Sequence, residues 1–280
     1  MNQEINIKQA LQQGANALAQ SATPNLDAQL LLAFVLDKQK AYLYAYPEQI
    51  LTALQQQVFA QLIQRRQQGE PIAYLLGEKE FWSLRLKVSI ATLVPRPETE
   101  CLVEWALSYF SENKIQVADL GTGSGAIALA LASERPQWDI LGTDKSVEAL
   151  AIAEENRDEL KLAAVQFAQG SWFQALPQGQ CYDLIISNPP YVAKNDPDLE
   201  QAVYSFEPQE AVIAKEEGFA DLKYLIQASK PYLKTQGILL LEHGCMQQSE
   251  LVEFAQQEGF SIVEKINDRQ SLPRALALRI

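Results

Sequence analysis

Four consecutive residues, Asn188, Pro189, Pro190 and Tyr191, have the functional groups to hold a planar amino group. Proline fixes φ and carries no N–H, so this turn offers backbone carbonyls without competing donors, and the Asn188 amide oxygen adds another acceptor. Two converging acceptors would fix the plane of an –NH2 group, and the Tyr191 ring would give it a flat apolar wall. The tetrapeptide therefore indicates a pocket for an amide or an amino-substituted base. A turn that only ends a strand, with an aromatic plug, is the structural alternative.

A glycine-rich loop, "DLGTGSGAIALALA", joins an apolar run to an Ala/Leu-rich segment with helical character. Glycines there let the backbone turn sharply and approach a ligand beside a helix N-terminus. Asp144 ends the next apolar run, where an acid that binds ribose hydroxyls is expected. Both a dinucleotide and another nucleotide-like cofactor fit this pattern, and a ligand-free turn with Asp144 as a helix cap is the structural alternative. The candidate loop residues are Gly121, Thr122, Gly123, Ser124 and Gly125.

The elements that position these residues alternate between short apolar runs and helical stretches from residue 115 onward. The runs are "IQVADLG", "WDILGTD", "AAVQFAQG", "YDLIISN" and "GILLLEHG". This alternation is typical of a doubly wound parallel sheet covered on both faces. Ligands of such sheets bind beyond the carboxyl ends of the strands, so we expect the strand before Asn188 to neighbour the glycine-loop strand. The last runs, "FSIVEKIND" and "RALALRI", predict two more strands, at least one of them antiparallel.

The N-terminal part has a helical pattern up to about Arg66. One expected helix follows "TPN" and a second begins at Pro47. The alternating segment "EFWSLRLKVS" predicts a hairpin or an extended connector. We therefore expect a helical substrate-recognition domain over residues 1–75, a hairpin or linker over 76–95 and a catalytic domain over 96–280. The apolar residues expected on one face of each helix are Leu26, Leu30, Leu31 and Phe34, and Leu51, Leu54, Val58 and Leu62.

The bulk composition limits the function classes. The chain has 280 residues, of which 48% are hydrophobic, and a formal net charge of −12. This charge disfavours nucleic acid as a partner, because such binders normally cluster Lys and Arg. Three widely spaced cysteines and a single histidine indicate neither a disulfide framework nor a metal site. Without a signal-peptide pattern or an apolar run of roughly 20 residues, we expect a cytoplasmic protein with no membrane partner.

Several further segments make the whole chain resemble a known family. The glycine loop with "SNPPYV" resembles S-adenosylmethionine-dependent methyltransferases that act on amino groups. "YLLGEKEFWSLRLKVSIATLVPRPETE", "GSWF", "LLLEHG" and "DRQSLPR" extend the resemblance to the release-factor glutamine methyltransferases, the PrmC/HemK family. "LDAQLLLAFVL" looks like the helical domain of that family. The resemblance implies a seven-stranded Rossmann-like methyltransferase domain preceded by a small α-helical domain.

The resemblance also implies residue roles. The loop from Gly121 to Gly125 and Asp144 would bind the methionine and ribose parts of S-adenosylmethionine, with Asn188 also next to the cofactor. Trp172 would flank the adenine, although Ser171 stands where members often have an acid. The tetrapeptide would hold the side chain of the substrate glutamine. The "PRPETE" segment, Pro95 to Glu100, would lie near the entrance, or alternatively serve as a stiff linker and helix cap.

The reaction expected from this resemblance is methyl transfer to the N5 nitrogen of the glutamine in the Gly-Gly-Gln motif of peptide-chain release factors. S-adenosylhomocysteine would be the second product. Asn188 and the Pro189 carbonyl would act in catalysis by orienting the amide, so no metal and no strong base are required. Glu242 and His243 are interpreted as structural. We expect a monomer whose N-terminal helices recognise the release factor.

Other functions remain open from the sequence. A ribosomal-protein glutamine methyltransferase shares these motifs. A nucleic-acid base-amine methyltransferase would use the same tetrapeptide, although the acidic charge argues against it. An NAD-dependent oxidoreductase would explain the glycine loop and Asp144 but not the residues from Asn188 to Tyr191. A non-catalytic adaptor on the same fold would bind cofactor weakly or not at all.

Overall fold

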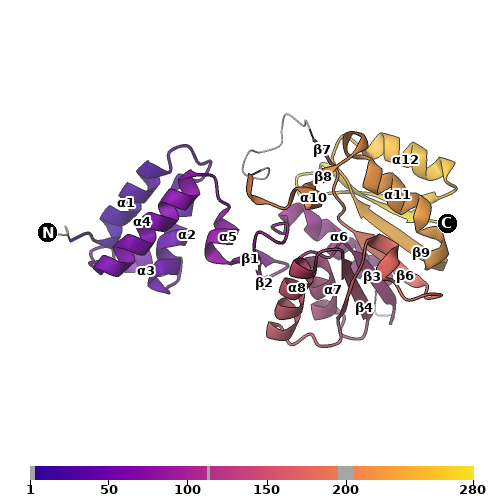
Figure 1. The fold of residues 1–280 in the computed structure, drawn as a ribbon, viewed down its shortest axis with the longest axis horizontal. Coiled ribbons are helices and arrows are strands. Elements are labelled where there is room, and N and C mark those ends of the chain that lie inside the picture. The colour runs from indigo at the N-terminus through magenta and orange to yellow at the C-terminus, as the bar shows by residue number, and fades with distance from the viewer. Residues whose placement is uncertain (1–3, 112–113, 195–204) are drawn as a thin grey trace. The chain divides into compact units, whose positions relative to one another are not determined.

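The chain folds into two units, Met1–Gly77 and Glu78–Ile280 (Figure 1). The computed structural model describes residues 4–111, 114–194 and 205–280. None of the helices in these residues is long and apolar enough to cross a membrane.

The first unit is helical. Asn6 with Gln9 and Thr52 with Gln55 form reciprocal capping boxes, which satisfy free N–H groups where the first and fourth helices begin. The fourth helix starts after Thr52, so the expected start at Pro47 is wrong. Its helices are α1 (Ile7–Ala17), α2 (Pro24–Leu36), α3 (Lys40–Ala45), α4 (Ala53–Gln67) and α5 (Ile72–Leu76).

The expected apolar faces of α2 and α4 are only partly buried. Leu31 is fully buried, but Leu26 and Phe34 are 41% and 50% exposed. Helix α2 is apolar around most of its circumference, so periodicity alone does not select the face that meets the core. Leu54 is 69% exposed, whereas Leu62 is buried as expected and Phe59, which was not expected on this face, is buried beside it. The unit therefore carries large apolar side chains on its surface.

A buried carboxylate ties two helices of this unit together. Asp27 on α2 accepts hydrogen bonds from the hydroxyls of Ser21 and Thr23, each at 2.8 Å. Arg66 on α4 completes the group with an ion pair of 2.8 Å to Asp27. The charge of Asp27 is thereby compensated within the core of the helical unit.

The second unit begins with an antiparallel hairpin, β1 (Glu78–Phe81) and β2 (Leu84–Lys87). Trp82 and Ser83 form its turn with positive φ values of 50° and 59°, as the favoured two-residue hairpin turns require. The hairpin predicted from "EFWSLRLKVS" is thus confirmed.

The main sheet of the second unit has seven strands in the order β10-β11-β9-β6-β3-β4-β5. Pairing is parallel from β9 through β6, β3 and β4 to β5, and antiparallel for β9 with β11 and β11 with β10. The doubly wound fold and the antiparallel C-terminal strands are therefore confirmed. The strands are β3 (Gln116–Leu120), β4 (Asp139–Asp144), β5 (Gln166–Gln169), β6 (Tyr182–Ser187), β9 (Leu233–Glu242), β10 (Ser261–Asn267) and β11 (Pro273–Arg279).

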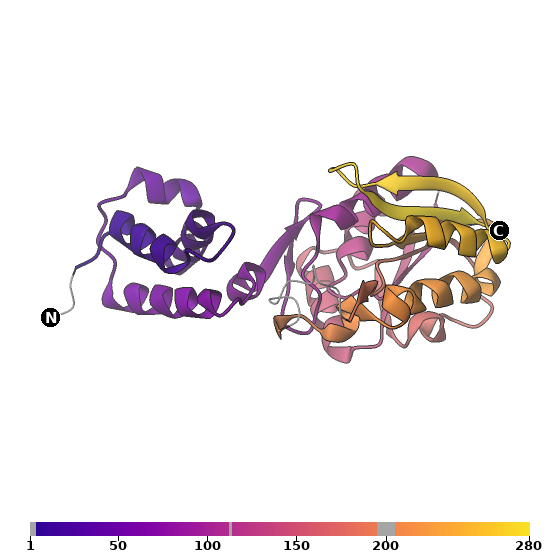
Figure 2. The ribbon, with the colours of Figure 1, turned by 90° about the horizontal axis from the view of Figure 1, so that it is seen from above.

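Helices cover both faces of this sheet, and Figure 2 shows the C-terminal hairpin at one edge. On one face lie α6 (Glu100–Phe110) and α7 (Ala126–Glu134), and α8 (Val147–Glu159) packs against β4 and β5. On the other lie α11 (Ala220–Ala228) and α12 (Gln248–Gln257), which contact each other. Shorter elements are β7 (Val192–Ala193), α10 (Gln209–Val212), β8 (Ile213–Ala214), η1 (Pro97–Thr99), η2 (Trp172–Ala175), η3 (Glu216–Gly218) and η4 (Lys230–Tyr232).

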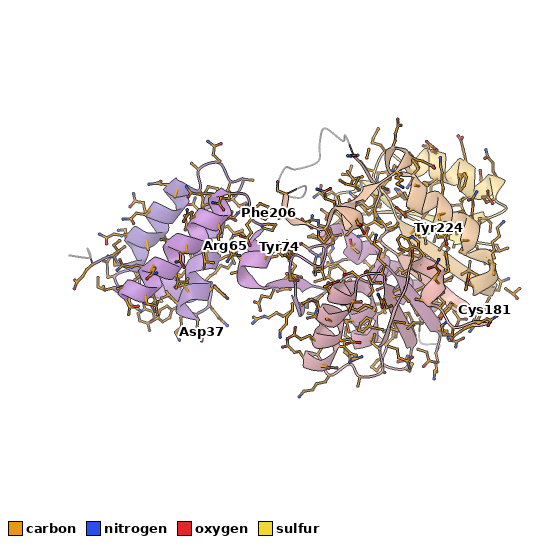
Figure 3. The ribbon with its side chains drawn as sticks, viewed as in Figure 1. Asp37, Arg65, Tyr74, Cys181, Phe206 and Tyr224 are labelled. Atoms are coloured by element: carbon orange, nitrogen blue, oxygen red, sulfur yellow. The ribbon has the colours of Figure 1, made fainter. Side chains whose placement is uncertain are left out.

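The connections place a topological switch point between β3 and β6. From β3 the chain continues to β4 on one side, whereas β6 pairs with β3 on the other. Cys181, labelled in Figure 3, immediately precedes β6 at the end of that strand opposite to the tetrapeptide. Loops at the carboxyl ends of β3 and β6 therefore meet at the same edge.

The ion pair of Arg66 with Asp27 generates a stability prediction. Replacing Arg66 with Met leaves a buried carboxylate without its cation, which costs about 3 kcal/mol of unfolding free energy. The matched control is Arg65→Met in the same helix, because Arg65 is half exposed in its pair with Glu70 and contributes less than about 1 kcal/mol. Urea unfolding followed by circular dichroism measures both, and equal losses would contradict the prediction.

Candidate active site

The glycine loop follows β3 and leads into α7. Gly121, Gly123 and Gly125 have φ values of 73°, 56° and 82°, a left-handed backbone that side chains disfavour. The N–H groups of Gly121 and Thr122 both donate to the carbonyl of Thr143 at 2.8 Å. The loop is therefore folded against the end of β4 beside the α7 N-terminus, and a Cβ placed on Gly123 would meet open space.

The carboxylate of Asp144 is held rigidly at the end of β4. One oxygen accepts from the Gly123 N–H and the other from the Ser146 N–H, each at 2.9 Å. Ser146, rather than Asp144, caps α8, so the capping alternative for Asp144 is wrong. Each carboxylate oxygen keeps a lone pair, so Asp144 is oriented to accept two further hydroxyl protons.

Asp119 is a buried acid that sequence reasoning missed. Its Oδ2 accepts from the Thr122 hydroxyl at 2.6 Å and from the Ala128 N–H at 3.2 Å, which braces the loop against α7. Its Oδ1 is buried and has no hydrogen-bond partner among the described residues. Burial raises the pKa of Asp119 to about 7, against the opposing effect of these hydrogen bonds. The sequence feature that could have indicated Asp119 is its position as an acid inside an apolar strand, directly before the glycine loop.

Trp172 lies over the glycine loop. A Cβ placed on Gly121 would be 3.3 Å from the indole ring, so the two residues are in contact. Burial raises the pKa of Asp221 at the start of α11, and the nearby Trp172 side chain opposes that shift. Ser171 has no carboxylate to offer, and Asp221 is a nearby acid that sequence reasoning missed. The loop is thus bordered by an aromatic ring with an acid beside it.

The tetrapeptide lies beside the glycine loop, as expected from the order of the strands. The Ser187 hydroxyl at the end of β6 donates to the Leu120 carbonyl at the end of β3, at 2.6 Å. Pro189 and Pro190 are buried, whereas Asn188 is half-buried. This arrangement brings the acceptor-rich turn and the glycine loop together at one edge of the sheet.

Both polar side chains of the tetrapeptide have partners from distant segments. The Asn188 amide Nδ2 donates to Thr99 Oγ1 at 3.1 Å, and the Tyr191 hydroxyl donates to Glu242 Oε1 at 3.0 Å. The Gln247 side chain donates to the Tyr191 carbonyl at 3.0 Å. Tyr191 is therefore anchored at both its backbone and its hydroxyl.

Glu242 lies fully buried behind the tetrapeptide. Desolvation raises the pKa of its carboxyl to about 7, although Thr99, Tyr191 and Arg274 each favour the ionised form. Arg274 is held in turn by Asp268, at 3.0 Å. Burial likewise raises the pKa of Tyr191 above its ordinary value. These groups form a connected polar cluster, which we call the support cluster: Thr99, Tyr191, Glu242, Asp268 and Arg274.

The "PRPETE" segment is braced on two sides. Arg96 pairs with buried Glu207 at 2.6 Å, and Glu207 also accepts from the Val94 N–H at 3.1 Å. Glu100 accepts from the Trp82 N–H at 2.9 Å and pairs with Arg269 at 2.9 Å. The Thr99 side chain makes no cap hydrogen bond to α6, so the helix-cap alternative is wrong for this residue.

His243 has no position suited to catalysis. It is fully buried, its Nδ1 lies 2.9 Å from the Gly244 carbonyl, and burial lowers its pKa. Within the described ranges, no three His, Cys, Asp or Glu side chains are grouped so that they could hold a metal ion. A cavity of about 350 Å³ lies between α6 and β10, lined by Trp105 and Glu264 among others, and does not include the glycine loop.

Comparisons with known proteins agree with this arrangement. A family model described as a methyltransferase domain matches residues 111–274, and one described as the PrmC N-terminal domain matches residues 9–77. The release factor glutamine methyltransferase of Shewanella oneidensis is 48% identical over 263 residues, which cover 94% of this chain and 92% of that protein. The chain belongs to the release factor glutamine methyltransferase family.

Other comparisons extend over similar lengths. The release factor glutamine methyltransferase of Coxiella burnetii is 45% identical over 277 residues, covering 98% of this chain and 99% of that protein. The crystal structure of a methyltransferase from Pyrococcus furiosus has a TM-score of 0.52 at 18% identity, covering 70% of this chain and 87% of that one. The similarity to the Pyrococcus furiosus structure concerns the fold alone. Membership of the release factor glutamine methyltransferase family makes the chain an enzyme that transfers methyl groups.

The buried carboxyl of Glu242 predicts a pH-dependent stability. The folded protein holds a proton on Glu242 up to about pH 7, whereas an unfolded glutamate releases it near 4.5. The unfolding free energy therefore falls as the pH rises from 5 to 7.5, by up to about 1.4 kcal/mol per pH unit for one such group. Asp119 acts in the same direction. We therefore compare Glu242→Gln with the parent at each pH. The unfolding free energy of the variant minus that of the parent should be larger at pH 7.5 than at pH 5.5.

Thermal unfolding of both proteins at the two pH values measures this effect. Glu154→Gln, which replaces an exposed glutamate on α8, is the matched control and should shift the melting temperature equally at both pH values. A Glu242→Gln difference that is the same at pH 5.5 and 7.5 would show that this carboxyl does not change its protonation state between these pH values and would contradict the prediction.

Proposed function

We propose that the chain transfers the methyl group of S-adenosylmethionine to the N5 amide nitrogen of the glutamine in the Gly-Gly-Gln motif of release factors. The observation that supports this most is the position of Asn188 and Pro189 beside the glycine loop, where the Ser187 hydroxyl joins β6 to β3. Family membership supplies the substrate class. The structure of the turn supplies the acceptors that an amide –NH2 group needs.

The residues around the loop fit S-adenosylmethionine. Positive-φ glycines open the backbone, Asp144 has free lone pairs for ribose hydroxyls, and Trp172 offers a ring for the adenine. The unpartnered Oδ1 of Asp119 suits a cationic amino group near the loop. When bound, the cofactor supplies a methyl group activated by a sulfonium. The proposed cofactor residues are Gly121, Thr122, Gly123, Ser124, Gly125, Asp144, Trp172 and Asn188.

The chemical task of the tetrapeptide is to activate a poor nucleophile. The lone pair of an amide nitrogen is delocalised into its carbonyl group, so attack requires strict orientation. Acceptors from the Asn188 side chain and the Pro189 carbonyl would fix the –NH2 plane and stabilise the positive charge that develops on nitrogen. The Tyr191 ring and Pro190 would confine the side chain, which helps to hold the nitrogen at roughly 3–3.5 Å from the methyl carbon. As the N–C bond forms, the S–C bond breaks with its electron pair left on sulfur, and the nitrogen releases one proton to water.

Two alternative substrates are disfavoured by specific observations. A ribosomal-protein glutamine would fit the same turn, but the relatives named above carry the release-factor name. A nucleic-acid base amine would also fit, but the net charge of −12 provides no general attraction for a phosphate backbone. An NAD-dependent oxidoreductase leaves Asn188 and its partners without a role.

We also propose that the helical unit recognises the release factor. Leu26 and Phe34 lie on α2 at a spacing that places them on the same side of the helix, and both are largely exposed. The same unit also exposes Tyr44, Tyr46, Ile50 and Leu54, and exposed apolar side chains that gather in a patch mark protein-binding surfaces. The residues that match the PrmC N-terminal domain model include this surface.

Mass spectrometry tests the proposed reaction directly. A bacterial release factor incubated with this protein and S-adenosylmethionine should gain one methyl group on the Gly-Gly-Gln glutamine. Asn188→Ala should lower the rate at least about 100-fold, because one acceptor that orients the amide is lost. A release factor that stays unmodified while the cofactor binds would redirect the search to the ribosomal-protein and nucleic-acid alternatives.

Ligand-induced stabilisation provides the control for that experiment. S-adenosylhomocysteine should raise the melting temperature of the parent, and that of Asn188→Ala by a smaller amount because Asn188 is only one of the proposed cofactor residues, whereas NAD should raise neither. Stabilisation by NAD alone would instead favour an oxidoreductase.

The surface of α2 generates a separate prediction. Leu26→Ser with Phe34→Ser should raise KM for an intact release factor about 10-fold, because two apolar contacts are lost. The rate with a short Gly-Gly-Gln peptide should not change. Tyr109→Ser, which replaces an exposed aromatic residue of the second unit, is the control. An unchanged KM for the release factor would argue against recognition by this surface.

A further inference from the structure

Apart from Tyr191, the residues of the support cluster behind the tetrapeptide have no role in the proposed function so far. Thr99 and Glu242 are both buried, and they come from η1 and the end of β9. Both nevertheless lie against the side chains that would hold the substrate. A buried ionisable group beside a binding residue requires a physical explanation, because burying it is costly.

Thr99 links Asn188 to Glu242. Its Oγ1 accepts a hydrogen bond from Asn188 Nδ2 at 3.1 Å, and its hydroxyl favours the ionised form of Glu242. Glu242 Oε1 accepts from the Tyr191 hydroxyl at 3.0 Å, and Glu242 Oε2 is buried without a hydrogen-bond partner among the described residues. The order of groups is therefore amide, hydroxyl, carboxylate and phenol.

The chemistry of these groups fixes the direction of every hydrogen bond. An ionised carboxylate only accepts: its Oε1 accepts from the Tyr191 hydroxyl, and its Oε2 is buried without a hydrogen-bond partner of its own among the described residues. The Thr99 hydroxyl, which favours this ionised form, therefore also directs its proton toward Glu242. A hydroxyl has one proton, so Thr99 then has only lone pairs left for Asn188. Asn188 must consequently present its –NH2 group to Thr99, and its Oδ1 is left for the substrate.

The opposite orientation of the Asn188 amide would be unproductive. The Asn188 –NH2 group would then face the –NH2 group of the substrate glutamine, and two donors repel each other. An asparagine amide has nearly the same shape in both orientations, so packing alone selects weakly between them. A polar partner of defined direction is needed to make the choice.

We propose that Thr99 and Glu242 are positioning residues that hold the Asn188 side chain with its Oδ1 toward the substrate amide. This inference rests on the proposed function. It explains why a threonine of the "PRPETE" segment and a glutamate of "LLLEHG" meet behind the tetrapeptide.

Neighbouring charges keep Glu242 available as an acceptor. Arg274 favours its ionised form, and Asp268 holds Arg274 through both Nε and a terminal guanidinium nitrogen, at 3.2 and 3.0 Å. Glu98 opposes ionisation. At pH 8, above the pKa of about 7 that burial gives Glu242, the carboxylate form dominates, so assays belong at this pH.

Kinetics of Thr99 variants provide the first test. Thr99→Val keeps the shape of the side chain but removes the hydroxyl, and should lower kcat for release factor methylation about 100-fold. KM for S-adenosylmethionine should not change. Thr99→Ser restores the hydroxyl and should recover most of kcat. Glu242→Gln should lower kcat, because the new amide can donate as well as accept a hydrogen bond. Equal kcat values for Thr99→Val and Thr99→Ser would overturn the proposal.

Nuclear magnetic resonance of the Asn188 side chain gives a readout that needs no activity. The –NH2 signal that Asn188→Asp removes should shift and exchange faster with water in Thr99→Val, but not in Thr99→Ser. An unchanged signal in Thr99→Val would overturn the proposal even if catalysis is impaired. A parent protein that methylates no release factor would refute the proposed function, whereas the Asn188 signal would still decide the hydrogen-bond direction. Melting temperatures confirm that each variant is folded.

Discussion

The pairing of β3 with β6 is the constraint on which the rest of the site depends. These parallel strands are neighbours although two other strands lie between them in the sequence, and the Ser187 hydroxyl joins their ends through the Leu120 carbonyl. Because the carboxyl ends of parallel strands meet at one edge, the glycine loop and the tetrapeptide face the same space. A shift of register by one residue would turn Asn188 and Asp119 to other faces of the sheet.

Buried polar groups define the site around this pair of strands. Asp119 braces the glycine loop from below, and Glu242 supports the tetrapeptide from behind. Each is costly to bury, so each receives hydrogen bonds: Asp119 from Thr122 and Ala128 nearby in the sequence, and Glu242 from the distant Tyr191. Rigid placement of acceptors before the substrate arrives is what an amide nitrogen requires, because its own reactivity is low.

The helical unit shows where local patterns mislead. The segment "LDAQLLLAFVL" predicts a helix correctly, but it is apolar on nearly every side, and the residues chosen as its inner face include Phe34, which is half exposed. In the seven-stranded sheet, by contrast, short apolar runs between glycine turns have one interpretation, so its strands and an antiparallel pairing at its C-terminal end were predicted. The separate hairpin at Trp82 was one of the two structures predicted for its segment. The start of α4 was misplaced because Thr52 supplies a stronger cap than Pro47.

The sequence by itself determined the succession of strands and helices along the second unit. It also determined the glycine loop, Asp144 as the acid after that loop, and the Asn-Pro-Pro-Tyr turn. These features follow from local rules, since φ preferences, periodicity and turn chemistry act over a few residues. Only the tertiary structure decided that Thr99, Glu242 and Arg274 stand behind the turn, and that Asp221 lies beside Trp172. A side-chain hydrogen bond between residues about 50 to 90 positions apart depends on how strands pair and helices pack, and no local pattern encodes that.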